Sequence, residues 1–396
     1  MTVLRLAIVG AGPAGLSLAL LAARALPQAQ ISLFDARPLD RDVSGDPRTL
    51  ALSLGSVQLL ERLGVWKGIN AQAIHEVHVS QAPPTLSSPL FGASGEPEVI
   101  ISAAEQGVER LGAVLAYGQL VAPLQAAWQA LEDPRLLTRF GSPVQAIKPV
   151  AGGVEIDAGI AETFDLAVVA EGGVFSDQAR KSVTRDYKQN AWVGTVTLSE
   201  DVPAGLAFER FTRNGPLALL PLPPQAGAPR RAALVWCMPQ DEDEIAGLTD
   251  AQRVTVIQTL LPPRAGKLLS IGPLKCFPLG LNAERSLVDG RSIRIGNAAQ
   301  TLHPVAGQGL NLGLRDAWSL VEALKKTDDI DAALRRVEWR RGPDRWTMIA
   351  ATDFLARSFA WRWPGLPGAR GLGLAAVQAL PILKRAVAKR MMFGAR

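Results

Sequence analysis

The chain has 396 residues, 48% of them hydrophobic and 20% charged, which excludes a disordered or fibrous protein and suggests two or three globular domains. Its two cysteines, Cys237 and Cys276, cannot form a disulfide framework or a thiolate metal site of the usual kind. The net charge of +5 permits contact with phosphates or an anionic membrane surface, but it is too small to indicate nucleic-acid binding.

The first forty residues predict a strand, a glycine turn, a helix and a second strand. The strand covers residues 4–9, the helix residues 14–25 and the second strand residues 31–34. Glycines interrupt the uncharged stretch 6–23, so we interpret it as a buried strand and helix and not as a signal peptide or membrane span. No other stretch is long and apolar enough to span a bilayer, and we therefore expect a cytoplasmic protein.

The turn between strand and helix has the spacing G-x-G-x-x-G, in Gly10, Gly12 and Gly15. Such a turn brings a pyrophosphate onto the backbone N–H groups of the helix N-terminus. Asp35 lies twenty residues after Gly15, at the end of the second strand, where a carboxylate accepts hydrogen bonds from ribose hydroxyls. The pattern predicts FAD or NAD and disfavours NADP, because a 2′-phosphate would be repelled; it does not choose between flavin and nicotinamide.

Three later segments carry further motifs. Apolar residues at 52, 59, 60 and 63 predict a helix with one buried face and Arg48 at its start. A buried strand at residues 164–170 runs into a turn at Glu171 and Gly172, with Ser176 and Arg180 beyond it. Another strand ends at Gly296, and the sequence Gly307-Gln308-Gly309 opens a helix that reaches about residue 325.

The remaining segments predict a second unit and exclude one metal site. Strand-like runs at residues 191–198, 217–221 and 231–238 indicate an antiparallel sheet. The Pro/Ser/Gly-rich residues 82–97 indicate a long loop that serves as a lid on the substrate side. His75 and His78 lie three apart in a predicted strand, which places them on opposite faces, so we predict no metal site.

These stretches together resemble the flavoprotein aromatic hydroxylases built like p-hydroxybenzoate hydroxylase, over nearly the whole chain, and within them the ubiquinone-biosynthesis hydroxylases. Residues 207–212, 215–217, 234–237 and 296–316 are most similar to enzymes that hydroxylate 2-polyprenyl-6-methoxyphenol. The resemblance implies an α/β fold: a Rossmann-like FAD-binding domain assembled from discontinuous segments, an inserted, mainly antiparallel β-sheet substrate domain and a helical C-terminus. The expected boundaries are 1–75, 104–180 and 275–335 for the FAD-binding domain, 76–103 and 181–274 for the substrate domain, and 336–396 for the helical region.

The resemblance also implies roles for individual residues. The adenosine and pyrophosphate of FAD would lie on Gly10, Gly12, Pro13, Ala14, Gly15 and Asp35, and Arg48 would reach the flavin side of the pyrophosphate. Asn297, which replaces the family's usual aspartate, would hydrogen-bond the ribityl or phosphate region of the cofactor. The flavin would contact Pro304, Gly307, Gln308, Gly309, Leu310 and Asn311. In the last three, the N–H groups would point at the N1–C2=O edge of the isoalloxazine. His303 is a candidate for substrate or flavin contact, with packing at the flavin edge an equal alternative.

Two departures from the family pattern qualify this set. Glu171 replaces the usual aspartate of an Asp-Gly pair, so the carboxylate is kept on a longer arm. The family often supplies an arginine or glutamine to the flavin from the helix after Tyr117, but residues 120–123 read Leu-Val-Ala-Pro, and we assign no such contact.

The activity implied is that of an FAD-dependent monooxygenase acting through a flavin C4a-hydroperoxide on a polyprenylated phenol, with O2 as co-substrate. NAD(P)H or another electron donor would reduce the flavin, and no second G-x-G-x-x-G is present for a nicotinamide. Three alternatives stay open: a hydroxylase of another aromatic substrate, a prenyl-chain reductase, and a non-catalytic prenyl-lipid carrier.

The end of the chain is cationic and amphipathic. Trp361 and Trp363 precede a predicted helix that starts at Pro381. That helix has Leu383, Val387 and Met391 on one side and Lys384, Arg385, Lys389 and Arg390 elsewhere. It fits an anionic membrane surface, at the inner face of the cytoplasmic membrane or in a ubiquinone-biosynthesis complex, and equally a helix packed on the protein with a solvated basic face.

Overall fold

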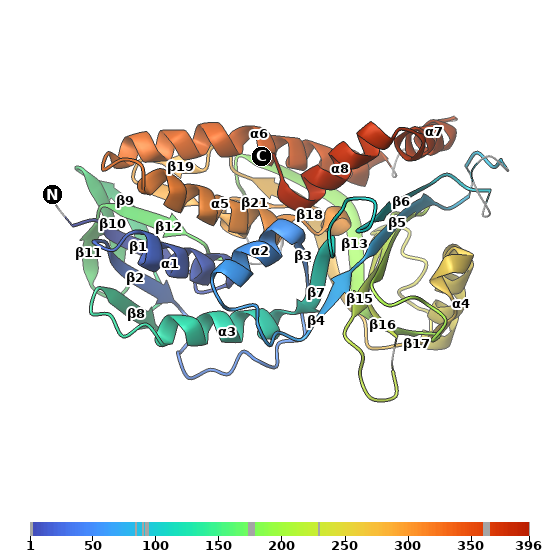
Figure 1. The fold of residues 1–396 in the computed structure, drawn as a ribbon, viewed down its shortest axis with the longest axis horizontal. Helices are drawn as coiled ribbons and strands as arrows, with labels where there is room; N and C mark the ends of the chain where they lie inside the picture. Colours follow the sequence, from blue (N-terminus) through green and yellow to red (C-terminus); the bar gives the residue numbers. More distant parts are fainter. Residues whose placement is uncertain are drawn as a thin grey trace.

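The computed structural model describes residues 3–83, 85–88, 91, 95–172, 179–228, 230–358 and 365–395. Figure 1 shows a parallel sheet with its helices at one end of the molecule and a large, mainly antiparallel sheet at the other. Long helices from the C-terminal part of the chain run along one side of both.

The parallel sheet has six strands in the order β19-β20-β12-β1-β2-β8. Their bounds are Arg5–Val9 (β1), Gln30–Asp35 (β2), Leu136–Phe140 (β8), Leu166–Val169 (β12), Val288–Asp289 (β19) and Ser292–Arg294 (β20). All neighbours are parallel except β19 and β20. The central strands are apolar along their length because both faces of the sheet are covered.

Helices cover one face of this sheet and a small meander covers the other. The helices are α1 (Pro13–Ala25), α3 (Tyr117–Gln129) and α5 (Gly309–Leu324), and α1 contacts both of the others. The meander consists of β9 (Ala146–Val150), β10 (Gly153–Asp157) and β11 (Ala161–Phe164). Its Ile156 and Phe164 pack with Val9 and Phe34 of the parallel sheet. Because β1, β2 and β12 are parallel, their carboxyl ends lie at the same edge of the sheet, where ligands bind in such sheets.

The second sheet has nine strands, in the order β21-β18-β13-β16-β15-β14-β5-β6 with β17 paired to β13. Their bounds are Glu76–Gln81 (β5), Glu98–Ser102 (β6), Val183–Leu198 (β13), Leu206–Phe211 (β14), Pro216–Leu222 (β15), Arg231–Pro239 (β16), Leu268–Ile271 (β17), Lys275–Ala283 (β18) and Gln300–Thr301 (β21). Only β14 and β5 are parallel. Helix α4 (Asp250–Leu260) and the short helix η3 (Pro263–Ala265) cover one face, where Phe208, Trp236 and Ile257 share a core.

A three-stranded sheet and helix α2 connect the two units. The sheet has the order β3-β7-β4, with bounds Thr49–Ser53 (β3), Ala71–Ile74 (β4) and Gly112–Ala116 (β7), and α2 spans Leu54–Arg62. Two short helices, η4 (Gly296–Ala298) and η5 (Pro304–Ala306), lead into α5.

The C-terminal helices are α6 (Ile330–Ser358), α7 (Leu366–Ala379) and α8 (Pro381–Phe393), which lie together along the top of Figure 1. Helix α8 packs through Ala388 and Met392, whereas Ile382 and Leu383 are 87% and 41% exposed. Within the described residues no single helix has the length and apolar composition to cross a bilayer; α7 and α8 reach it only taken together, across a 95° bend.

The predicted fold class is confirmed: a Rossmann-like unit from discontinuous segments, a mainly antiparallel sheet and a helical C-terminus. Two local predictions are wrong. Arg48 precedes strand β3, and the helix begins only at Leu54, because residues 49–53 pair with β7. His75 and His78 do not share a strand, since β5 begins at Glu76. Ser176, Trp361, Trp363 and part of residues 82–97 lie outside the described residues.

Candidate functional site

The first glycine turn joins β1 to α1 and leaves no room for side chains. Gly10 has φ +103°, and a Cβ there would lie 2.8 Å from the backbone nitrogen of Glu171. A Cβ on Gly15 would lie 1.9 Å from the carbonyl oxygen of Gly10. Gly12 is the N-cap residue, followed by Pro13 at the first helical position. The turn therefore presents the backbone N–H groups of a helix N-terminus at the carboxyl edge of the sheet.

Two carboxylates flank this turn. Asp35 ends β2 and accepts hydrogen bonds from the backbone nitrogens of Ala11, at 2.6 Å, and Arg37, at 2.8 Å. Glu171 follows β12, and partial burial together with the charge of Asp35 raises the pKa of its carboxyl. Both acids follow strands that pair in parallel with β1, one on each side of it, so they lie at the same edge of the sheet.

Arg48 is held beside the same turn by two neighbours. Its guanidinium pairs with Asp46 at 2.7 Å and lies 4.0 Å from the ring centroid of Tyr117. The Tyr117 hydroxyl in turn lies 3.6 Å from where a Cβ on Gly12 would stand. The Arg48 side chain remains 67% exposed. Tyr117 is a residue that the sequence did not single out, since nothing local marks it as a neighbour of the glycine turn.

The N-terminus of α5 lies against that of α1. A Cβ on Gly313 would be 2.8 Å from the Cα of Gly296 and 3.4 Å from the Cβ of Ala14. Asn297 lies in η4 beside Gly309, since a Cβ on Gly309 would be 3.5 Å from its Oδ1. The structure thus brings the first glycine turn, Asn297 and the start of α5 together, although they are separated by about 280 residues along the chain.

Side chains of the α5 turn are occupied by the protein itself. The buried Asn311 accepts from the backbone nitrogen of Ser53 and from Ser56 Oγ, and its Nδ2 donates to the carbonyls of Ala51 and Gly307. Gln308 Oε1 accepts from Arg315. These bonds fix the turn and leave backbone N–H groups, which have no intrahelical acceptor, as the groups available to a ligand.

His303 fixes the approach to η5. Its Nδ1 accepts from the backbone nitrogen of Val305 at 3.2 Å, so the proton is on Nε2, which lies 3.1 Å from Gln189 Oε1. Burial lowers the pKa of His303 to about 4, so the ring is neutral near pH 7. Both ring nitrogens are therefore engaged, and His303 holds the Pro304 turn against β13.

The antiparallel sheet turns one face toward this turn. Val305 packs with Phe211 of β14 and Val79 of β5. Glu209 is two residues before Phe211, on the same face, and pairs directly with Val79 across the strands. Its Oε1 is buried without a hydrogen-bond partner in the described structure, and burial raises the pKa of its carboxyl to about 8.

Glu209 is the second residue of the candidate site that the sequence did not single out. It appeared only within a stretch that carried the resemblance. An acidic residue beside Arg210 in a strand whose other residues are apolar was the available signal. In the described part of the chain, no three His, Cys, Asp or Glu side chains are grouped as metal ligands.

Comparisons with known proteins find a FAD-binding family model, ubiquinone-biosynthesis hydroxylases and a FAD-bound structure of similar fold. A family model described as "FAD binding domain" matches residues 176–332. Ubiquinone hydroxylase UbiL of Rhodospirillum rubrum is 31% identical, over 88% of this chain and 80% of its own length. The 3-demethoxyubiquinol 3-hydroxylase of Escherichia coli is 29% identical and covers 97% of both chains. Among solved structures, Klebsiella pneumoniae HpxO in complex with FAD and uric acid has a TM-score of 0.71 at 18% identity, over 99% of this chain and 97% of that one; this likeness concerns the fold.

Proposed function

The chain belongs to the FAD-dependent ubiquinone-biosynthesis hydroxylases, and from this premise we propose that it hydroxylates the ring of a polyprenylated phenol. The observation that carries the proposal is the contact between the N-termini of α1 and α5 through Ala14, Gly296 and Gly313. Two helix N-termini at one sheet edge supply fixed dipoles to a pyrophosphate and to a flavin ring in the same cofactor.

The residues present fit FAD. The pyrophosphate would lie at Gly12, Pro13 and Ala14, where the close approach of Gly10 and Gly15 keeps side chains away. Asp35 and Arg48 would hold the ribose and the flavin side of the pyrophosphate. The amides of Gly309, Leu310 and Asn311 would meet the N1–C2=O edge, with Asn297, Pro304, Gly307 and Gln308 forming the surrounding turn. When bound and reduced by NAD(P)H or another donor, FAD supplies the oxygen chemistry with O2.

Glu209 would hold the phenol proton. Its face of β14 lies opposite the Pro304 turn through the contact of Val79 and Phe211 with Val305. A carboxyl with a pKa of about 8 is deprotonated in part near neutral pH and can accept a proton from a phenol. Removing that proton makes the ring more electron-rich, which favours transfer of oxygen to it.

The choice of substrate within the pathway rests on a finer comparison. The relatives are named for ubiquinone and for 3-demethoxyubiquinol, whereas the motifs are most similar to those of enzymes acting on 2-polyprenyl-6-methoxyphenol. Deleting the gene in a quinone-making host decides between them: accumulation of 2-polyprenyl-6-methoxyphenol supports the proposal, and accumulation of a later demethoxy intermediate reassigns the step.

The reaction class is tested on purified protein. We expect a yellow flavin spectrum and one atom from labelled O2 in the product. Two added hydrogens in place of oxygen would identify a prenyl reductase. Protein that takes up no FAD, even when FAD is added in excess, would contradict the whole scheme.

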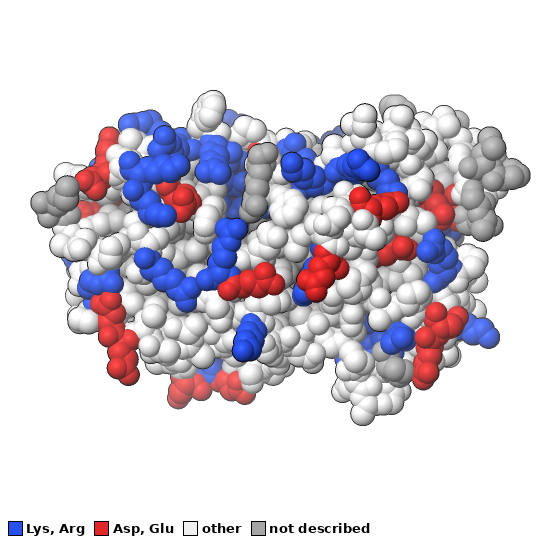
Figure 2. Space-filling view, in the orientation of Figure 1, with Lys and Arg blue, Asp and Glu red and all other residues white. Residues whose placement is uncertain are grey.

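We also propose that α8 contacts an anionic membrane surface at the inner face of the cytoplasmic membrane, where a polyprenyl substrate resides. Helix α8 leaves Ile382, Leu383 and Val387 exposed beside the exposed Arg385 and Lys389. Figure 2 shows lysine and arginine side chains gathered along the side of the molecule formed by α6 and α8. Apolar residues flanked by cations favour insertion into an anionic interface.

The membrane contact is tested by flotation with phosphatidylglycerol vesicles. The double variant Ile382→Glu/Leu383→Glu should bind at least about tenfold more weakly, because burying each apolar side chain contributes about 1.5–3 kcal/mol. Ile160→Glu changes another exposed isoleucine, 77% exposed against 87% for Ile382, at the β10–β11 turn and serves as the control. Equal flotation of both variants would refute the contact.

A further inference from the structure

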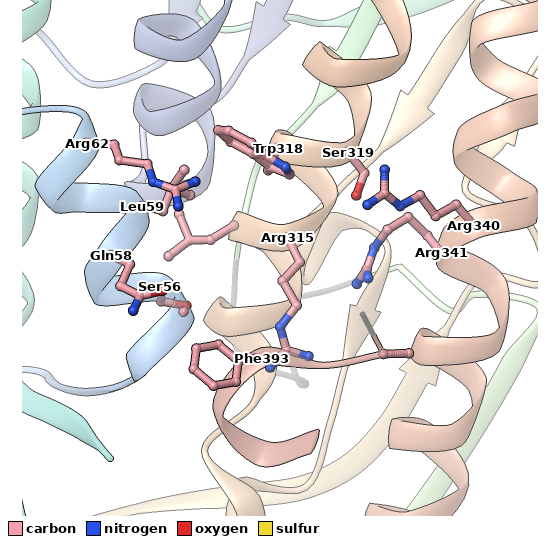
Figure 3. Close-up of a pocket in the computed structure, with 13 residues that line it drawn as sticks. Ser56, Gln58, Leu59, Arg62, Arg315, Trp318, Ser319, Arg340, Arg341 and Phe393 are labelled. Carbon is pink, nitrogen blue, oxygen red and sulfur yellow. The ribbon is translucent and has the colours of Figure 1, made fainter. Parts of the chain in front are cut away.

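A cavity of about 60 Å³ lies between α2, α5, α6 and the end of α8, apart from the residues assigned to FAD. Four arginines line it, and we call it the arginine pocket: Arg62, Arg315, Arg340 and Arg341, with Trp318 and Phe393 completing its walls. Figure 3 shows Arg62 of α2 beside Leu59 and Trp318 on one side of the cavity, Arg340 and Arg341 of α6 on the opposite side, and Arg315 of α5 reaching toward Phe393. A cavity of this size holds a few water molecules or one small anion, and not a nucleotide.

On the floor of the arginine pocket two arginines are balanced by two aspartates, but one buried guanidinium nitrogen and one buried carboxylate oxygen, Asp316 Oδ2, have no partner in the described structure. Arg341 is buried. Its Nε donates to Asp316 at 2.7 Å and its Nη1 donates to Asp344 at 2.7 Å, but its Nη2 has no partner in the described structure. Arg315 shares Asp344 at 3.4 Å. Burial lowers the pKa of Arg315, and Asp344 opposes this only in part.

The rim adds two further cations. Arg62 and Arg340 are exposed, and in the described chain neither has a carboxylate within 4.0 Å. The guanidinium of Arg62 lies 5.5 Å from the ring centroid of Trp318, which holds it at the rim. Among the described residues, four guanidinium groups thus line the cavity beside two carboxylates, which is an excess of two positive charges.

We propose that the arginine pocket binds a phosphate-sized dianion, either free phosphate or the phosphate group of a larger molecule that extends past the rim. Guanidinium groups present paired donors that match phosphate oxygens, and two negative charges balance the excess. The exposed rim admits the remainder of a larger ligand, whereas the buried floor holds only the charged group.

The arginine pocket adjoins the back of the α5 N-terminus. Arg315 Nη2 donates to Gln308 Oε1 at 3.1 Å, and Ser56, another lining residue, donates from Oγ to Asn311 Oδ1 at 2.7 Å. Anion binding therefore fixes the turn that presents amides to the flavin, and it slows the release of FAD. This second part of the inference rests on the proposed function.

The test is calorimetric titration of the FAD-loaded protein with sodium phosphate, against sodium chloride at equal ionic strength. The double variant Arg62→Gln/Arg340→Gln should lose at least about tenfold in phosphate affinity, since each removes a charge-assisted contact. Arg336→Gln, one turn before Arg340 on α6 and exposed, is the matched control and should bind as the wild type. Phosphate at about 100 times its Kd should raise the Tm of the wild type by at least about 2 °C.

Equal phosphate affinity in the double variant and the control, or a Tm shift that chloride reproduces, would overturn the site. Two arms separate the sources of the anion. If phosphatidic acid vesicles compete with phosphate while phosphatidylcholine vesicles do not, the ligand is a lipid headgroup; if phosphate binding persists with vesicles present, it is a free phosphate.

The coupling has its own measurement. Release of FAD, followed by fluorescence, should slow at least about twofold with phosphate in the wild type and stay unchanged in the double variant. An unchanged rate in the wild type would overturn the coupling. Protein that never takes up FAD would refute the proposed function, whereas the titration would still decide the arginine pocket.

Discussion

The two regions that face each other across the candidate site are built differently. On the α1 and α5 side, glycines bring backbones into contact and the groups available to a ligand are amides. On the β14 side, the sheet contributes side chains, with Glu209 beside the apolar Val79 and Phe211. Backbone groups have fixed positions and suit a constant cofactor, whereas side chains can differ between relatives and suit a particular substrate.

The largest effect should follow from filling the first glycine turn. Gly15→Ala places a Cβ 1.9 Å from the Gly10 carbonyl oxygen, so the turn must open and FAD affinity should fall at least about 100-fold. Gly342→Ala on α6 is the control, because nothing lies within 4 Å of its Cβ, and it should leave FAD binding unchanged. FAD affinity measured by flavin fluorescence checks both; normal affinity in Gly15→Ala would remove the cofactor from this turn.

On the other side, Glu209→Gln should lower kcat about 10- to 100-fold while FAD binding stays intact. The activity of the wild type should rise with pH through about 8, where the carboxyl loses its proton, and the variant should lack this limb. Glu200→Gln, an exposed acid at a strand end, is the control. A variant that keeps the rising limb would show that another group holds the proton.

Stability gives an independent check on Glu209. Its pKa is raised on folding, so between pH 4.5 and 8 the native state binds more protons than the unfolded state. Stability from this residue must therefore fall as the pH rises across that range. Glu209→Gln should show a smaller fall in Tm between pH 5 and 8 than the wild type; parallel curves would mean that the carboxyl titrates normally.

The smallest effect should come from the bond that links the two sides. Gln189→Leu removes the acceptor of His303 Nε2 and leaves a buried donor unpaired, which should cost about 1–3 kcal/mol in the free energy of unfolding. Urea denaturation measures it, with Thr197→Val on the same strand as control. The FAD affinity of Gln189→Leu should fall less than that of Gly15→Ala. An equally large loss would mean that the antiparallel sheet also determines the geometry of the cofactor site.

Sequence reasoning worked where the requirement is local. The strand–turn–helix at residues 5–25 and the helix at Gly309 were predicted because apolar runs and glycine spacing are properties of neighbouring residues. It failed at Arg48, where residues 49–53 form a strand only because β7 pairs with them. For α8 the sequence left two alternatives open, and only the structure shows that Ala388 and Met392 face the core, that Lys384 turns inward to Glu105 and that Leu383 is exposed.

The sequence by itself determined the parallel-sheet fold, the dinucleotide turn and the family, because each depends on short spacings that backbone geometry imposes. Only the tertiary structure decided that the N-terminal turns of α1 and α5 pack against each other, that Glu209 faces the Pro304 turn and that four arginines line one cavity. Those placements depend on strand register and helix packing between segments hundreds of residues apart, and no local pattern of residue types encodes them.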